Sequence, residues 1–199
     1  MSAGDRPEGP PTDARPAAAL PDYYTRQYCE ENVWHLCQDP GVEADEAHVV
    51  FISNAQEACA FWMQRAAPAA RQPVLWDYHV ILLGRQTGWK VWDLDSRLPR
   101  PVDALEYLRE TFRHERAVPA PLRPRFRVVP RAIFLDTFAS DRSHMRLGDG
   151  GWLAPPPPRP PIRTAAEAMN LPRFVDTRRP FVGRLFDLAG LRGWLAAGG

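Results

Sequence analysis

The sequence predicts a single α+β domain in which a mixed, mainly antiparallel sheet is flanked by helices. Its 199 residues are 45% hydrophobic, which is enough apolar surface to bury one core of ordinary size. Short β-branched and aromatic runs alternate with helical stretches. The two runs at 74–83 and 89–95 flank the turn sequence Gly-Arg-Gln-Thr-Gly, which predicts an antiparallel hairpin.

The ends and the charge of the chain limit its location and partners. Residues 1–21 are rich in Pro, Ala and Gly, so we expect a mobile tail there and one folded domain over 22–199. The sequence has no signal-peptide core and no run of about 18 uncharged apolar residues, so we expect a soluble intracellular protein. With 25 basic and 24 acidic side chains, it has no net field to attract nucleic acid or an anionic membrane.

The first half of the domain is expected to contain two helices and a strand before the hairpin. The stretch 30–38 predicts a helix, because Val33, Trp34, Leu36 and Cys37 can share one buried side. The β-branched run 48–54 is typical of a strand, and 56–66 is expected to be a helix.

The second half begins after Pro99 and Pro101 with an expected helix over 102–114. The run 125–130 predicts a strand with an apolar segment behind it, and a short helix near 183–197 should close the chain. Six prolines within 155–161 predict an extended polyproline-type segment, since each ring fixes φ and removes an amide donor. We interpret this segment as a rigid surface wrap, with a ligand for an SH3 or WW domain as the alternative.

The three cysteines differ in their setting. Their spacing matches neither a disulfide framework nor a paired zinc motif, so we expect reduced thiols. Cys37 and Cys59 lie in apolar stretches and are expected in the core. Cys29 lies at a helix start, where the helix dipole lowers a thiol pKa, but Glu30 and Glu31 oppose thiolate formation. If Cys29 is a nucleophile, a histidine must therefore supply part of its activation.

The hairpin offers such a histidine. A regular antiparallel pair centred on Gln86 places His79 directly opposite Asp93, with Cβ atoms about 4.5–5.5 Å apart. Asp93 could then fix the tautomer of His79, whereas a slip of one residue would send the two side chains to opposite faces. Without further support, a core histidine and a turn-capping aspartate explain these two residues better than a catalytic pair. A zinc site from Cys29, His79, Asp93 or His144 has no recognisable spacing, so we expect no metal and no other cofactor.

Several long segments carry a resemblance to a known family. They are YCEENVWHLC (28–37), VFISN (50–54), VLWDYHVILL (74–83), VWDLDSRLP (91–99), FASDRSHM (138–145), the proline run and MNLPRFVD (169–176). In this order they resemble the protein N-terminal glutamine amidohydrolase family, from about Tyr23 to Asp176. The resemblance implies a papain/transglutaminase-like cysteine hydrolase core with catalytic Cys29, His79 and Asp93.

The resemblance also implies a reaction and a setting. The Cys29 thiolate would attack the side-chain amide of an N-terminal glutamine on a protein or peptide, release ammonia through His79, and leave a thioester that water converts to glutamate. The catalytic domain would act as a monomer in the cytoplasm and also in the nucleus. Its product would feed an arginine-conjugating step of protein degradation, the N-degron pathway.

Three aspartates, a tryptophan and a serine are candidates for contacts with the substrate. Asp77, Asp95 and Asp141 are candidates for the substrate α-ammonium, and the hairpin register places Asp77 opposite Asp95. The alternative is that one pairs with an arginine and the other caps a turn. Trp76 could form a wall of the pocket or part of the core, and Ser140 and Asp141 in FASDRSHM could line the pocket or only order their loop.

Two other functions remain compatible with the residues. A Cys–His–Asp group can attack any acyl carbon, so a peptidase or transglutaminase on the same scaffold is one alternative. A non-enzymatic interaction module that binds through its proline run, with Cys29 merely buried, is the other. Ammonia release and the reactivity of the Cys29 thiol separate these functions.

Overall fold

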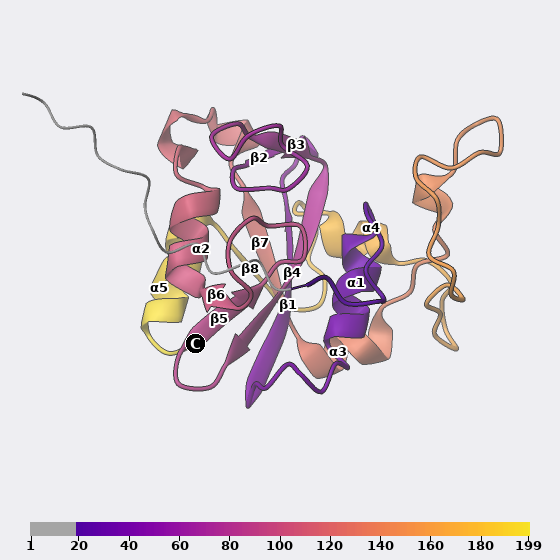
Figure 1. The fold of residues 1–199 in the computed structure, drawn as a ribbon, viewed down its shortest axis with the longest axis horizontal. Coiled ribbons are helices and arrows are strands. Elements are labelled where there is room, and N and C mark those ends of the chain that lie inside the picture. Colours follow the sequence, from indigo (N-terminus) through magenta and orange to yellow (C-terminus); the bar gives the residue numbers. More distant parts are fainter. Residues whose placement is uncertain (1–18) are drawn as a thin grey trace, which may run out of the picture.

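The computed structural model describes residues 19–199 and contains a six-stranded sheet with helices on both faces (Figure 1). The strand order is β6-β5-β4-β1-β7-β8, and every neighbouring pair is antiparallel. The strands are β1 (Glu46–Ser53), β4 (Tyr78–Arg85), β5 (Trp89–Trp92), β6 (Val102–Asp103), β7 (Arg125–Pro130) and β8 (Arg184–Phe186). The predicted α+β domain with a mainly antiparallel sheet is confirmed; most of the expected tail, residues 1–18, lies outside the described residues.

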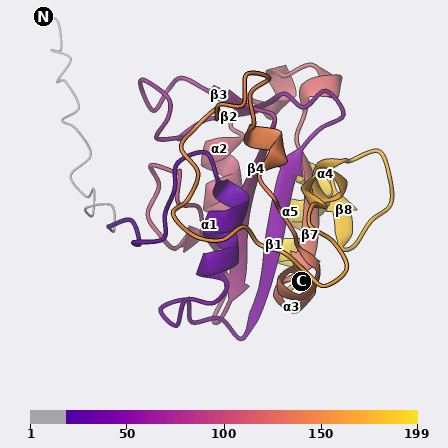
Figure 2. The same cartoon turned by 90° about the vertical axis from the view of Figure 1, so that its right-hand side faces the viewer.

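The helices form a layer on each side of this sheet, as Figures 1 and 2 show. One side carries α2 (Ala104–Thr111) and α5 (Leu188–Ala196), and the other carries α1 (Cys29–Leu36), α3 (Arg131–Thr137) and α4 (Leu171–Val175). The central strand β1 serves both layers, because successive side chains of a strand point to opposite faces. Val50 and Ile52 pack in the α2 and α5 core, and Val49 and Phe51 pack in the other.

The expected helix at 56–66 is wrong. The chain forms turns there and a short strand, β2 (Cys59–Phe61), which pairs with β3 (Val74–Trp76) in a separate two-stranded sheet. The Asn54 side chain holds the first turn by accepting from the amides of Gln56 and Ala58, and Glu57 has a positive φ of 49°. These local bonds and the strand pairing override the helical pattern.

Other boundaries differ from the expected ones in the same way. The run 74–83 is two strands, because the chain leaves one sheet after Trp76 and enters the other at Tyr78. The helix expected over 102–114 begins after Asp103, whose carboxylate accepts from the amides of Leu105 and Glu106 as an N-cap. The expected helix at 183–197 is the strand β8 followed by α5.

The helix expected at 30–38 is confirmed as α1, and Val33, Leu36 and Cys37 are buried there. The strand at 125–130 is confirmed as β7, and the segment behind it forms α3. Cys37 and Cys59 are free and buried, as expected for core thiols.

The hairpin exists, but its register is shifted from the predicted one. Leu82 pairs with Trp92 and Arg85 with Trp89, so the turn is centred on Thr87 rather than Gln86. The ladder ends at Trp92, and neither His79 nor Asp93 is paired across it. The residue opposite each position of β4 therefore lies two places further along the chain than predicted. A shift by an even number keeps the side chains of His79 and Asp93 on one face of the hairpin.

The proline segment packs against the domain without forming a helix or strand. Buried Arg142 donates to the carbonyl of Pro157 at 3.2 Å and forms a two-bond ion pair with Glu31 of α1, each bond 2.7 Å long. Tyr28 donates to the carbonyl of Ala154 at 3.0 Å. These bonds tie the segment to the start of α1. Within residues 19–199, no helix is long and apolar enough to cross a membrane.

Candidate active site

His79 lies on the part of β4 that β5 does not reach. Its backbone is held by β1, through pairing with Ile52, while the ladder with β5 starts only at Leu82. The imidazole is 3% exposed, stacks on the Trp76 ring and meets the edge of the Phe61 ring, with ring centroids 6.4 and 5.5 Å away. Aromatic contacts on two sides therefore fix the ring of His79.

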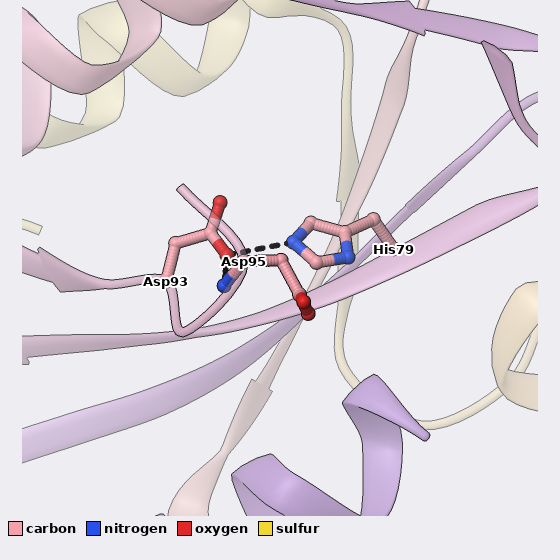
Figure 3. Close-up of side chains that lie close together, drawn as sticks. All are labelled: His79, Asp93 and Asp95. Atoms are coloured by element: carbon pink, nitrogen blue, oxygen red, sulfur yellow. Dashed lines mark hydrogen bonds and ion pairs between the residues drawn. The ribbon is translucent and has the colours of Figure 1, made fainter. Parts of the chain in front are cut away.

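Asp93 begins the turn after β5 and faces His79 from there. Its Oδ1 accepts from Nε2 of His79 and from the amide of Asp95, both at 2.9 Å. Its Oδ2 accepts from the hydroxyl of Tyr107 at 2.8 Å and from the amide side chain of Gln64 at 3.2 Å. Four donors thus orient one buried carboxylate, and the second nitrogen of His79, Nδ1, is turned away from Asp93 (Figure 3).

The two side chains shift each other's pKa. Burial alone would raise the pKa of Asp93, but the charge and hydrogen bond of His79 and the other donors hold it below its usual value. Burial alone would lower the pKa of His79, but the charge and hydrogen bond of Asp93, together with the charges of Asp95 and Glu30, outweigh it and raise that pKa. The pair is therefore suited to hold a proton on His79 that has been taken from a third group.

Cys29 is the first residue of α1, and this helix packs against β4. The amide of Val80, next to His79, donates a hydrogen bond to the Cys29 sulfur. The thiol also donates to Oε2 of Glu30, 3.7 Å from Sγ. The nucleophile candidate therefore contacts both the histidine strand and a buried carboxyl group.

The electrostatics of Cys29 differ from the expected helix-dipole activation. Burial raises the pKa of the thiol well above its ordinary value, and the negative charges of Glu30 and Asp95 raise it further. The hydrogen bond from Val80 lowers it only in part. The free site thus favours a neutral thiol, and ionisation requires a base that accepts the proton or a cation that offsets the carboxylates.

Cys29 and His79 open onto one cavity of about 810 Å³, which is large enough for the end of a peptide chain. Asp95, Asp77 and Trp76 line it as well. The other residues of the wall come from the N-terminal segment, the turns on either side of β2, the start of β4, the segment before the prolines, and α4 with the residues after it: Leu20, Tyr24, Arg26, Gln27, Glu57, Arg65, Ala66, Tyr78, His144, Met145, Leu153, Leu171, Pro172, Val175, Asp176 and Arg178. Cys29 and His79 thus line one cavity, and Asp93 is linked to it through its hydrogen bond to His79.

The sequence profile of the N-terminal glutamine amidase family matches residues 24–193. The chain belongs to this N-terminal glutamine amidase family. The protein N-terminal glutamine amidohydrolase of Homo sapiens is 39% identical over 177 residues, which cover 86% of this chain and 82% of the human protein. The protein of the same name from Bos taurus is 38% identical, over 87% of this chain and 87% of its own length. The one from Danio rerio is 40% identical, over 76% of this chain and 78% of its own length. The resemblance found in the sequence motifs is confirmed.

The glutamine amidase match spans the cavity, but the residues suggested for substrate binding do not all lie there. Trp76, Asp77 and Asp95 line the cavity. Ser140 is buried and bridges to Ile162, and Asp141 accepts from the amide of Ser143 in its own loop. Neither Ser140 nor Asp141 is among the lining residues, so the loop-ordering alternative describes them.

The same segment reaches the cavity through residues that we had not assigned to substrate binding. His144 and Met145 line the wall, and His144 Nε2 lies 3.3 Å from the hydroxyl of Tyr78 and 3.5 Å from Glu30. Gln64 and Tyr107 were also missed, although both hold Asp93. Each reaches the site from a different element, and no spacing in the sequence connects them.

A metal ion is a further possibility that the geometry raises. One ligand atom each from His79, Asp93 and Asp95 lie within 4.8 Å of one another, and Figure 3 shows this group. Both oxygens of Asp93, however, already accept two hydrogen bonds each, and Nε2 of His79 donates one of them. A metal there would displace these bonds, so the arrangement fits a proton-transfer pair better than a metal centre.

Proposed function

We propose that this chain hydrolyses the side-chain amide of an N-terminal glutamine on proteins and peptides, giving N-terminal glutamate and ammonia through a thioester on Cys29. The observation that carries this proposal is that Cys29 and a His79 oriented by Asp93 open onto one cavity. The family and the names of its relatives supply the substrate class. The residues supply a nucleophile, a base and an orienting carboxylate.

The first half of the reaction forms the thioester. His79 accepts the thiol proton through Nδ1 as Cys29 sulfur attacks the amide carbon, because Nε2 is engaged by Asp93. The tetrahedral intermediate collapses when His79 returns the proton to the leaving nitrogen, so that the C–N bond breaks and ammonia departs. Proton transfer during the attack suits a thiol whose pKa is raised by its surroundings.

The second half restores the enzyme. His79 takes a proton from water, the oxygen attacks the thioester carbon, and the C–S bond breaks to return the thiol. The negative oxygen of each intermediate needs hydrogen-bond donors, and the first-turn amides of an α-helix have no carbonyl partner within the helix. The amide of Cys29 at the start of α1 is therefore our candidate donor.

The setting of this activity is part of the same proposal. We propose a monomer that acts in the cytoplasm and also in the nucleus, with proteins carrying a free N-terminal glutamine as its partners. The near balance of charge, 25 basic against 24 acidic side chains, favours neither nucleic acid nor a membrane surface. The N-terminal glutamate would then enter an arginine-conjugating step of the N-degron pathway.

Two peptides that differ only in a free or acetylated N-terminal glutamine test the activity. We expect ammonia from the free peptide alone, no backbone cleavage, and a product one mass unit heavier than the substrate. Cys29→Ala should abolish the activity, whereas Cys37→Ala, in the core beside α3, should retain it. Cleavage products or amine incorporation would identify a peptidase or transglutaminase, and absence of any reaction would favour the interaction module.

A further inference from the structure

We propose, on the basis of the function above, that Asp95 is the residue that binds the α-ammonium group of the substrate's N-terminal glutamine. A free N-terminus differs from the rest of a polypeptide chain by one positive charge, so its selection requires an acidic or carbonyl group at the closed end of the site. Asp95 has the position, the burial and the missing cation that this role requires.

The position of Asp95 relates it to the reacting groups. It follows Asp93 by two residues, and its amide donates to the carboxylate of Asp93, so the two acids belong to one turn. Its carboxylate lies within 4.8 Å of a ring nitrogen of His79 (Figure 3). Asp95 also lines the same cavity as Cys29. An extended glutamine spans about 5 Å from its α-nitrogen to its amide carbon, so its ammonium group and its side-chain amide can both lie within this cavity.

The orientation of Asp95 is fixed by a neutral group. Tyr24 donates from its hydroxyl to Oδ1 of Asp95 at 2.5 Å, and the tyrosine itself lines the cavity. Among residues 19–199, Asp95 has no ion pair with a lysine or arginine; the charges of Arg65 and Arg100 attract it without forming an ion pair with its carboxylate. Burial raises the pKa of Asp95, and the charge of His79 only partly offsets this. A half-buried carboxylate of this kind is stabilised when a cation binds.

The other acids of the cavity wall fit the role less well. Asp77 is exposed, and its Oδ1 accepts from the amide of Tyr78. Asp176 bonds to the side chain of Arg178, so it already has a cation. Glu57 is exposed at a turn. The predicted pairing of Asp77 with Asp95 across the hairpin does not form, because the β4–β5 ladder ends at Leu82 and Trp92.

Recognition by Asp95 would also activate the nucleophile. The negative charge of Asp95 is one of the causes that raise the pKa of Cys29. An ammonium ion bound to Asp95 offsets that charge and favours the thiolate when the correct substrate is in place. An acetylated N-terminus brings no positive charge, so it neither pairs with the carboxylate of Asp95 nor favours the Cys29 thiolate.

The test compares two peptides that differ only at the α-position of the first residue, one with the ammonium group and one with a hydroxyl in its place. In the wild type, we expect kcat/KM to favour the ammonium peptide by about 10²-fold or more. Asp95→Asn should lower kcat/KM for the ammonium peptide by a similar factor and change the hydroxyl peptide by less than about threefold, so the preference disappears. The matched control is Asp136→Asn, at an exposed position of α3.

Each other outcome counts against one proposal or the other. A preference that survives in Asp95→Asn, or that disappears in Asp77→Asn instead, overturns the role of Asp95. Absence of ammonia from wild-type protein with either peptide overturns the proposed function on which this role rests. If Asp95→Asn does not fold, Tyr24→Phe carries the test, because it removes the hydrogen bond that orients the Asp95 carboxylate. We expect this variant to lower the preference for the ammonium peptide by about three- to tenfold. An unchanged preference overturns the role of Asp95.

Discussion

Nε2 of His79 lies 2.9 Å from Oδ1 of Asp93, although the two residues are not partners in the strands that bring them near each other. Asp93 arrives from the turn after β5, and β1 rather than β5 holds the backbone of His79. The contact therefore depends on how that turn is held. Gln64 and Tyr107 hold it by donating to the second oxygen of Asp93.

Replacing Asp93 by Asn tests the orienting role. The amide keeps the shape of the side chain but removes the charge that raises the pKa of His79, and burial then lowers that pKa. We expect kcat/KM for ammonia release to fall by about 10²–10⁴-fold. The acid limb of its pH profile should move to lower pH, because His79 in the variant has a lower pKa than in the wild type and stays deprotonated down to a lower pH. A wild-type profile in Asp93→Asn would contradict this role.

Tyr107→Phe removes one donor from Asp93 and leaves its charge. The hydroxyl is buried, and its hydrogen bond to Oδ2 of Asp93 is 2.8 Å long. We therefore expect the free energy of unfolding, measured with urea, to decrease by about 1 kcal/mol. Because Gln64 still holds the same oxygen, kcat/KM should fall by only about three- to thirtyfold. A decrease as large as that of Asp93→Asn would mean that Tyr107 acts in some other way.

The sequence predicted the main sheet and the His79–Asp93 contact for different reasons. The runs at β1 and β4 are buried on both faces, and those at β5 and β7 are rich in β-branched and aromatic residues, which makes strands easy to recognise. His79 and Asp93 were placed together by a register that is itself wrong. The prediction held because the shift was two residues, and a shift by an even number leaves side chains on the same face.

The parts that the sequence did not predict depend on contacts between distant segments. The stretch 56–66 has a helical pattern, but Cys59–Phe61 pairs with Val74–Trp76, and Asn54 closes a turn. Likewise, Tyr24 reaches Asp95 over 71 positions and Tyr107 reaches Asp93 over 14. No periodicity records such contacts, so the supporting residues of the site appear only in three dimensions.

Arg142 tests how the proline segment supports the nucleophile helix. Its guanidinium bonds to both oxygens of Glu31 and to carbonyls of the segment, and both charged side chains are buried. Arg142→Ala leaves Glu31 buried without its cation, so we expect a loss of about 3–5 kcal/mol in the free energy of unfolding by urea. Arg142→Lys keeps the charge but not the two-bond geometry and should lose less. Equal stability of Arg142→Ala and wild type would contradict this account.

Glu30 should make stability depend on pH in an unusual direction. Burial raises its pKa from 4.5 to about 7, so the folded protein holds this proton more tightly than the unfolded chain. That contribution is fully present below pH 4.5 and is lost as pH rises to about 7. Glu30→Gln cannot titrate, so its stability relative to wild type should increase over this range, by on the order of a few kcal/mol. Urea unfolding of both proteins at several pH values checks this; a constant difference would contradict it.

The reactivity of Cys29 in the free enzyme provides the last prediction. A thiolate already formed at neutral pH would react rapidly with iodoacetamide, and its rate would be level above pH 6 or so. Burial and the charges of Glu30 and Asp95 raise the thiol pKa instead, so we expect slow alkylation at pH 7 and a rate that rises steadily toward alkaline pH. Asp95→Asn removes one of these charges, so it should increase the rate at pH 7, whereas the exposed control Asp136→Asn should not. Rapid, pH-independent alkylation of wild-type Cys29 would show that His79 ionises the thiol before substrate binds, and that the charge of the substrate is not needed for activation.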